Sequence, residues 1–121
     1  GSRSGAPALA LAAAERAGRL RLHVRTDERT AAFLALGLAK RSGTPVPVLT
    51  TSGTAAAHLH AAVLEADASG LPLLALTADR PPELRSTGAN QTIEQAALFG
   101  GAVRWGADVG VPEAGREDAQ N

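Results

Sequence analysis

The chain has 121 residues, and its 12 lysine and arginine side chains balance 12 aspartate and glutamate side chains. A net charge of zero leaves no basic surplus for nucleic acid, and this length is typical of one domain. The absence of cysteine excludes disulfide bonds and thiolate metal sites and fits a cytoplasmic protein. No apolar run approaches the ~20 residues that a membrane span needs.

The first part of the chain predicts two helices separated by a strand. The alanine- and leucine-rich run 6–17 has high helix propensity and is stopped by Gly18. Residues 20–25 alternate apolar and basic side chains, which predicts a short strand. Asp27 is placed to cap a second helix that ends at Gly43. We expect this helix to bury a stripe formed by Ala31, Leu34, Ala35 and Leu38.

The middle of the chain predicts a strand, a helix and a second strand. Residues 45–50 form a short apolar strand, in which Pro47 favours an edge position because proline has no N–H to donate. A third helix closes at Gly70. Residues 71–76 are continuously apolar, as in a strand buried on both faces of a parallel sheet. The apolar stripe of the third helix is Leu59, Ala62, Val63 and Ala66.

The last third of the chain has a weaker periodicity of apolar residues. We expect a helix over 92–99 and a weak strand over 103–105. Residues 110–121 have no apolar periodicity and are interpreted as a linker or disordered tail, which leaves 1–109 as the domain.

Strands that alternate with helices over short loops predict an α/β fold, a parallel sheet flanked by helices. Ligands of such sheets bind beyond the carboxyl ends of the strands. Polar segments follow the predicted strands at 26–28, at 51–54 and at 79–80. We therefore expect a binding site at this edge, although α/β folds of many functions share the arrangement.

Taken alone, each polar residue at this edge also has an ordinary structural explanation. Glu28 complements the dipole of its helix, and the loop 51–54 is either an anion or polar-ring site or a simple helix cap. Arg80, stiffened by two following prolines, either grips a carboxylate or pairs with Glu83 at the surface. The histidines are interpreted as structural or exposed, so the chain itself predicts no metal site.

The order of several segments resembles one family throughout residues 1 to about 101. It is the family of 2-succinyl-5-enolpyruvyl-6-hydroxy-3-cyclohexene-1-carboxylate synthases (MenD). The TADRPPEL and GANQ segments are specific to this synthase, whereas DER and TSGTA are shared in outline with acetolactate-synthase-like enzymes. The segments that carry the resemblance are 1–4 (GSRS), 27–29 (DER), 35–39 (ALGLA), 51–55 (TSGTA), 77–84 (TADRPPEL) and 88–91 (GANQ).

This resemblance implies the pyrimidine-binding module of a thiamine-diphosphate enzyme, truncated at its N-terminus. In the family, a helix and a strand precede the SRS loop. A downstream Gly-Asp-Gly segment holds Mg²⁺ and the cofactor diphosphate. Neither is present, so we expect a fragment that is inactive alone, with the metal ligands outside it. The chain starts at Gly1 without methionine, and Gly1–Ser2 is either native or a cloning scar.

The resemblance also implies a role for each candidate residue. Glu28 is the catalytic glutamate that hydrogen-bonds the aminopyrimidine ring and favours its imino tautomer, which removes the C2 proton of the cofactor. The activated cofactor decarboxylates 2-oxoglutarate, and the product adds to isochorismate. Thr51, Ser52, Gly53 and Thr54 are expected to bind the cofactor with Glu28. The isochorismate site is expected to comprise Ser2, Arg3, Arg80, Asn90 and Gln91.

Two alternatives remain open at this point. One is another thiamine-diphosphate enzyme of the acetolactate-synthase type. The other is a non-catalytic α/β module that binds a phosphate-sugar through the serine-rich loop and leaves Glu28 without a role. The family resemblance further implies a homo-oligomer in which subunits share each site. The family reads Asn and Pro where this chain has His58 and Ala61, positions on a helix away from the expected substrate.

Overall fold

The computed structural model describes residues 1–111, which contain two parallel strands and four α-helices. β1 (Val46–Thr50) pairs with β2 (Leu73–Thr77), with the first and last residues of the two strands opposite one another. This parallel pairing confirms the α/β fold class. The helices are α1 (Gly5–Arg16), α2 (Glu28–Ser42), α3 (Thr54–Ala57) and α4 (His60–Ser69), and the short 3-10 turns are η1 (Ser2–Ser4), η2 (Pro82–Leu84) and η3 (Gly100–Ala102).

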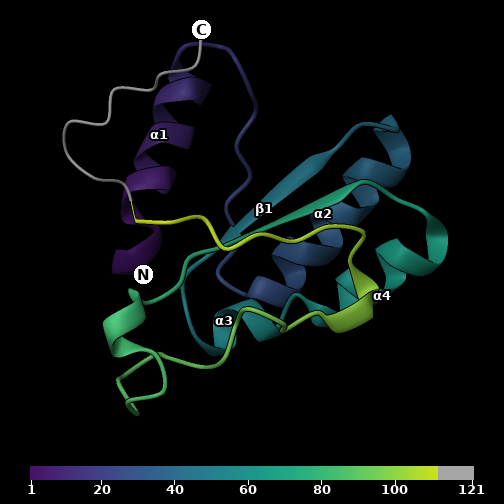
Figure 1. The fold of residues 1–121 in the computed structure, drawn as a ribbon. Coiled ribbons are helices and arrows are strands. Elements are labelled where there is room, and N and C mark those ends of the chain that lie inside the picture. The colour runs from purple at the N-terminus through teal and green to yellow at the C-terminus, as the bar shows by residue number, and fades with distance from the viewer. Residues whose placement is uncertain (112–121) are drawn as a thin grey trace, which may run out of the picture.

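The core lies between the two strands and the pair α2 and α4. Figure 1 shows these helices against one face of the sheet, whereas α1 stands apart and is joined to α2 by an extended stretch of chain. Most of the core residues are small, which lets the helices approach the sheet closely. Leu59 is completely buried at its centre. The core cluster comprises Ala32, Ala35, Val48, Leu59, Ala62 and Val63.

The ends of α2 follow the predicted capping chemistry. The Asp27 carboxylate accepts the N–H groups of Arg29 (2.8 Å) and Thr30 (3.4 Å), which satisfies donors that lack a partner within the helix. At the other end, Gly43 adopts a left-handed conformation, with φ 68°, and donates its N–H to Ala39. Gly70 closes α4 in the same way, with φ 63°. The predictions for these three residues are confirmed.

The cap makes the stability of α2 dependent on pH. The hydrogen bond from the Arg29 side chain holds the pKa of Asp27 well below its ordinary range. A lowered folded-state pKa contributes stability above the unfolded-state pKa, and this contribution disappears as the pH falls through the folded-state value. We expect Asp27→Ala to be less stable than the wild type at neutral pH and the difference to shrink toward about pH 2. Thermal unfolding across this range tests it. Asp27→Asn, which keeps a neutral cap, separates the charge from the hydrogen bond, and a pH-independent difference for Asp27→Ala would contradict the expectation.

Other helix and strand predictions in the middle of the chain are confirmed in outline. β1 pairs on one side only within residues 1–111, so Pro47 does lie in an edge strand. The third helix divides into α3 and α4, and its predicted stripe is buried. The predicted stripe of α2 is displaced, because Leu34 and Leu38 are only half-buried and line a cavity beside β1. The buried residues of α2 are Ala32, Ala35, Leu36 and Ala39.

The predicted strand at 20–25 is wrong. This segment is extended but pairs with no strand in the structure, and Leu22 donates its N–H to the side chain of Glu15 (2.8 Å) instead. Both this segment and β1 line the same cavity of about 810 Å³. Alternating side chains create a strand only where a neighbouring edge completes the backbone hydrogen bonds.

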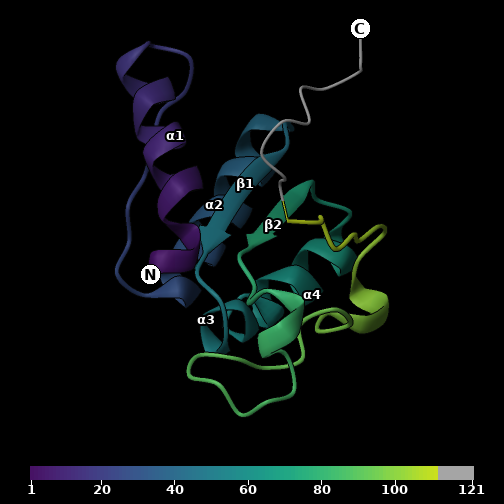
Figure 2. The same ribbon diagram turned by 60° about the vertical axis from the view of Figure 1, so that its left-hand side comes forward.

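The apolar run at 71–76 forms β2, but the prediction that it is buried on both faces is wrong. Leu74 and Leu76 are 49% and 46% exposed, because α2 and α4 cover only the opposite face. Figure 2 shows the sheet with this uncovered side turned into view. None of the helices within residues 1–111 is both long enough and apolar enough to cross a membrane.

The helix expected at 92–99 and the strand expected at 103–105 are also wrong. Residues 92–95 are irregular and 96–99 form turns, and the side chain of Gln95 hydrogen-bonds other segments of the chain. Arg104 pairs with Asp67 of α4, and no strand pairs with 103–105. In both places contacts to distant residues replace the local pattern. Most of the tail expected at 110–121 lies outside the described residues.

Candidate active site

The carboxyl ends of β1 and β2 lie side by side. The strands are in register up to Thr50 and Thr77, and the N–H of Ala78 donates to the carbonyl of Thr50 (3.1 Å). The loop 51–53 leaves the end of β1, and Ala78 to Arg80 leave the end of β2. The structure therefore places two of the three predicted polar segments next to each other.

The loop after β1 is held by hydrogen bonds to the segment around Gln91. Ser52 is completely buried, and its hydroxyl donates to the carbonyl of Gln91 (2.9 Å). The Gly53 N–H donates to the side-chain carbonyl of Gln95 (2.8 Å) and is therefore not free for an anion. The hydroxyl of the half-buried Thr51 accepts from the Gln91 amide (3.3 Å), and Thr54 is exposed at the start of α3.

Arg80 contacts the backbone of the expected substrate-binding segment. Its Nε and Nη2 donate to the carbonyl of Asn90 at 3.2 and 2.9 Å, and its own N–H donates to the Asp79 carboxylate (2.7 Å). The surface pair with Glu83, the structural alternative for Arg80, does not form in the described part of the chain. Arg80, Asn90 and Gln91 are thus brought together, and their role in binding a substrate stays a prediction.

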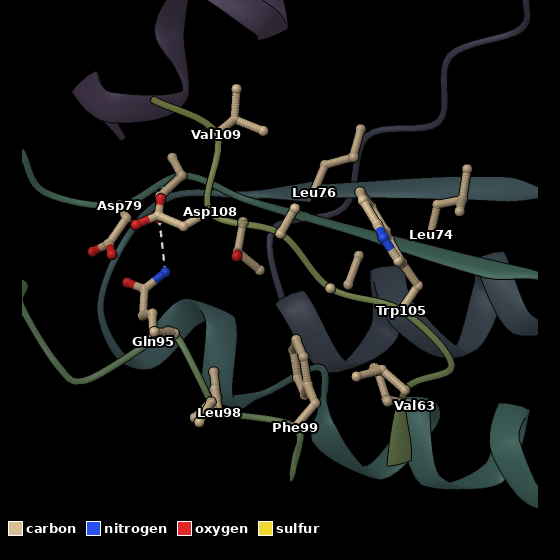
Figure 3. A pocket seen from close by; sticks show the side chains of 18 of the residues that line it. Val63, Leu74, Leu76, Asp79, Gln95, Leu98, Phe99, Trp105, Asp108 and Val109 are labelled. Atoms are coloured by element: carbon tan, nitrogen blue, oxygen red, sulfur yellow. Dashed lines mark hydrogen bonds between the residues drawn. The ribbon is translucent and has the colours of Figure 1, made fainter. Parts of the chain in front are cut away.

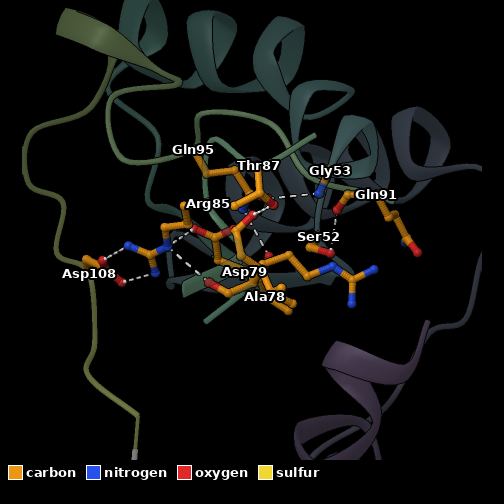
Figure 4. A network of polar contacts seen from close by, with 11 residues as sticks. Ser52, Gly53, Ala78, Asp79, Arg85, Thr87, Gln91, Gln95 and Asp108 are labelled. Carbon is orange, nitrogen blue, oxygen red and sulfur yellow. Dashed lines mark hydrogen bonds and ion pairs between the residues drawn. The ribbon is translucent and has the colours of Figure 1, made fainter. Parts of the chain in front are cut away.

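A second arginine, Arg85, connects the loop after β2 to the segment around Asp108. It forms ion pairs with Asp79 (3.3 Å) and Asp108 (2.6 Å), and its Nε donates to the carbonyl of Arg80 (3.0 Å). The hydrogen bond from Arg85 lowers the pKa of Asp108, and the same bond raises the pKa of Arg85. Figure 4 shows this network beside the loop that contains Ser52 and Gly53.

Glu28 lies at the start of α2, on the cavity of about 810 Å³ that follows the free edge of β1. Its side chain is half-buried. Thr50 lines the same cavity, is only 5% exposed, and its hydroxyl has no hydrogen-bond partner in the described residues. Polar residues from several separate segments therefore line one cavity, and Ser4, Glu28, Thr50 and Thr51 are among them.

A larger cavity of about 1120 Å³ lies on the other side of β2. Arg3 and Arg80 both line it, together with Asp79 and Gln95. Figure 3 shows its apolar part, where Trp105 lies near Leu74 and Leu76. The other predicted substrate residues, Ser2, Asn90 and Gln91, are exposed and line neither cavity. Within residues 1–111, no cluster of three histidine, aspartate or glutamate side chains is positioned to hold a metal ion.

Comparison with protein families identifies the kind of domain that carries these strand ends. Residues 3–98 match the family described as the thiamine pyrophosphate enzyme, N-terminal TPP binding domain. The chain belongs to this thiamine pyrophosphate enzyme family. Thiamine pyrophosphate, also called thiamine diphosphate, is the cofactor of this family, and the matched residues include both loops at the strand ends.

Several relatives of this thiamine pyrophosphate enzyme domain have the same name. The chain is 64% identical over 113 residues to the 2-succinyl-5-enolpyruvyl-6-hydroxy-3-cyclohexene-1-carboxylate synthase of Thermobifida fusca, covering 93% of this chain and 20% of the relative. It is 58% identical over 118 residues to the synthase of Leifsonia xyli, covering 98% of this chain and 20% of the relative. Over 123 residues it is 58% identical to the synthase of Mycobacteroides abscessus, covering 100% of this chain and 23% of the relative. The chain thus spans about a fifth of the length of these synthases.

The sequence alone did not single out three polar residues of this thiamine pyrophosphate enzyme domain. Gln95 falls within the helix expected at 92–99, and no neighbouring residue indicates that its side chain hydrogen-bonds two loops. Arg85 pairs with Asp108, 23 residues further along the chain, which no spacing rule predicts. Thr50 was interpreted only as the end of a strand, although a hydroxyl there carries a polar group into the sheet.

Proposed function

We propose that this domain belongs to a synthase that uses thiamine diphosphate to decarboxylate 2-oxoglutarate and adds the product to isochorismate, in menaquinone biosynthesis. The observation that carries the proposal is the 58–64% sequence identity, along nearly the whole chain, to three proteins named 2-succinyl-5-enolpyruvyl-6-hydroxy-3-cyclohexene-1-carboxylate synthase. The activity belongs to the longer protein, a transferase. We expect the 121-residue chain alone to be inactive.

The cavity beside β1 has the chemistry that an aminopyrimidine ring requires. Such a ring carries nitrogen acceptors and an amino donor. Glu28 offers a carboxylate there, and Thr50 offers a buried hydroxyl that has no partner in the described residues. A buried polar group without a partner is costly, so a ligand that hydrogen-bonds Thr50 would recover that cost. The residues present therefore fit the pyrimidine end of the cofactor.

Glu28 is the proposed catalytic residue. When bound, thiamine diphosphate supplies an electron sink for the loss of carbon dioxide from a 2-oxo acid. Glu28 would hold a proton at the pyrimidine ring nitrogen, and its half-buried position limits the competition of water for that hydrogen bond. Thr51 to Thr54 form the proposed remainder of the cofactor contact, in which Ser52 and Gly53 act through the shape of the loop that they fix.

The diphosphate end of the cofactor would be bound elsewhere. We propose that Mg²⁺ and its ligands lie outside this chain and that subunits of a homo-oligomer share each site. The protein would work in the cytoplasm. On this account the 121-residue chain binds thiamine diphosphate only weakly.

Isochorismate carries two carboxylates, and the proposed site offers two arginines for them. Arg3 and Arg80 line one cavity. Pro81 and Pro82 follow Arg80 and restrict the backbone of its loop. Arg80 already donates two N–H groups to one carbonyl oxygen of Asn90, so its guanidinium is oriented before substrate arrives. Ser2, Asn90 and Gln91 complete the proposed set.

Replacing Arg80 by lysine tests this substrate assignment in the full-length protein. Lysine keeps the charge but loses the planar fork that can bind a carboxylate through two hydrogen bonds. Losing one charge-assisted hydrogen bond costs ~1.5–3 kcal/mol, so we expect KM for isochorismate to rise about 10- to 100-fold. The rate of 2-oxoglutarate decarboxylation without isochorismate should change little, because the donor reacts first.

The matched control is Arg41→Lys, at an exposed position in the last turn of α2. It should leave both measurements unchanged. An equal fall in both half-reactions for Arg80→Lys would instead assign Arg80 to the fold or to the cofactor. No change in either would place it at the surface.

The reaction itself is tested by offering different donors to the full-length protein with thiamine diphosphate and Mg²⁺. We expect carbon dioxide release from 2-oxoglutarate and an isochorismate adduct formed in equal amount. Preferential use of pyruvate, with acetolactate as product, would replace the proposal by the acetolactate-synthase alternative. Absence of any thiamine-dependent release would leave the phosphate-sugar module.

A further inference from the structure

Gln95 joins the two strand-end loops through a single side chain. Its Oε1 accepts the N–H of Gly53 (2.8 Å), and its Nε2 donates to the carbonyl of Ala78 (2.9 Å). We infer that Gln95 is a positioning residue that sets the loop after β1 against the loop after β2. Figure 4 shows the amide between these two partners.

An amide suits this position because both partners are fixed backbone groups of opposite kind. Gly53 presents a donor and Ala78 presents an acceptor, and the two lie in the loops that follow different strands. A glutamine side chain is neutral and offers one acceptor and two donors. A leucine of similar size satisfies neither partner. An ionised glutamate is repelled by the carbonyl of Ala78, which displaces its carboxylate and weakens the hydrogen bond to Gly53 as well.

The segment that carries Gln95 reinforces the same loop with its backbone. Ser52 donates its hydroxyl to the carbonyl of Gln91, and the Gly53 backbone packs against that carbonyl so closely that an added Cβ would lie 2.9 Å from it. Two residues four positions apart therefore hold two consecutive residues of the loop. The segment between them is irregular and does not form the expected helix.

The inferred role deepens the proposed function and rests on it. Thr51 and Arg80 are proposed ligand contacts that lie close in sequence to the two residues that Gln95 joins. Thr51 lies two residues before Gly53, and Arg80 lies two residues after Ala78. A change in the spacing of the loops would move the cofactor contact relative to the carboxylate contact. Gln95 itself touches neither reacting atoms nor a proposed catalytic residue in the structure.

The first experiment measures hydrogen exchange of the Gly53 amide by NMR in the 121-residue chain. We expect the protection factor of Gly53 to fall about five- to tenfold in Gln95→Leu, as for the loss of one hydrogen bond. The neighbouring variant Glu94→Gln, at an exposed position, should leave it unchanged. Unchanged Gly53 protection in Gln95→Leu would overturn the inference.

The second experiment uses Gln95→Glu, because a protonated carboxyl reproduces both hydrogen bonds of the amide. Ionisation is opposed by the Ala78 carbonyl and by Asp79, and it is favoured by Arg80 and Arg85. Glu94 is a further charged neighbour along the chain, and the loop after β1 contributes no charge. We expect Gly53 protection to be near the wild-type value at about pH 4 and to fall as the pH rises through the carboxyl titration.

Recovery of Gly53 protection at low pH in Gln95→Glu distinguishes a hydrogen-bonding role of Gln95 from a role in packing alone. Gln95→Leu should show no recovery, because it has no titrating group. If Gln95→Leu does not fold, Gln95→Glu decides alone, and equal protection of Gly53 at both pH values or loss of the fold at both would overturn the inference.

In the full-length protein, Gln95→Glu at neutral pH should raise KM for isochorismate about five- to tenfold and change the rate of 2-oxoglutarate decarboxylation less than twofold. A wild-type KM, or a fall in both half-reactions together, would refute the positioning role. Should the full-length protein show no thiamine-dependent activity in any variant, the proposed function fails. The Gly53 measurement then still decides whether Gln95 holds the two loops.

Discussion

Replacing Gly53 by alanine is expected to destabilise the chain by at least ~2 kcal/mol. Gly53 has φ 82° and ψ −145°, a conformation that is essentially restricted to glycine. An added Cβ would also lie 2.9 Å from both the carbonyl carbon and the carbonyl oxygen of Gln91. Relief requires movement of the backbone that Ser52 binds, so the strain spreads into the loop. Urea unfolding of the wild type and the variant measures the loss.

Gly70→Ala is the matched control. Gly70 also has a positive φ, 63°, but nothing lies within 4 Å of the position that an added Cβ would occupy. Alanine there should cost about 1 kcal/mol, the conformational penalty alone. The difference between the two variants measures the contact between Gly53 and Gln91 together with the rarer backbone conformation of Gly53. Equal losses in both would show that this close approach does not hold the loop.

Replacing Glu28 by glutamine in the full-length protein is expected to lower kcat by about 10²- to 10⁴-fold, the usual contribution of a positioned proton-transfer group. The amide is nearly isosteric and still hydrogen-bonds the ring, so affinity for thiamine diphosphate should change only a few-fold. It cannot stabilise a proton on the ring nitrogen as a carboxylate does.

Glu83→Gln is the control for Glu28→Gln. It removes the same charge at an exposed position in η2, outside both cavities, and should leave kcat unchanged. Steady-state kinetics and calorimetry of cofactor binding separate the two effects. A fall in cofactor affinity as large as the fall in kcat would make Glu28 a binding residue only.

Local chemistry explains which parts of the fold were predictable. Asp27, Gly43 and Gly70 end their helices through short-range hydrogen bonds and left-handed turns, which a few neighbouring residues determine. Residues 20–25 and 103–105 have strand-like patterns, but a strand needs an edge with which to pair. The sequence predicts the side-chain alternation of such segments but does not show whether they lie close enough to an edge to pair with it.

The candidate site also contains some residues that the sequence predicts and others that only the structure reveals. The grouping of Arg80 with Asn90 and Gln91 follows from motifs whose order alone pointed to one family, and the structure brings them together. The link made by Gln95 depends on two backbone groups 17 and 42 residues away, so no local pattern reveals it. The unpartnered hydroxyl of Thr50 likewise becomes visible only when its surroundings are known.

Exchange of the C2 proton of bound thiamine diphosphate tests the central claim most directly. It is measured by NMR in the full-length protein with Mg²⁺ and no substrate, so it reports on Glu28 before isochorismate or 2-oxoglutarate takes part. We predict fast exchange in the wild type and exchange at least about 100-fold slower in Glu28→Gln. Equal exchange rates in the two proteins would contradict the assignment of Glu28 as the residue that activates the cofactor.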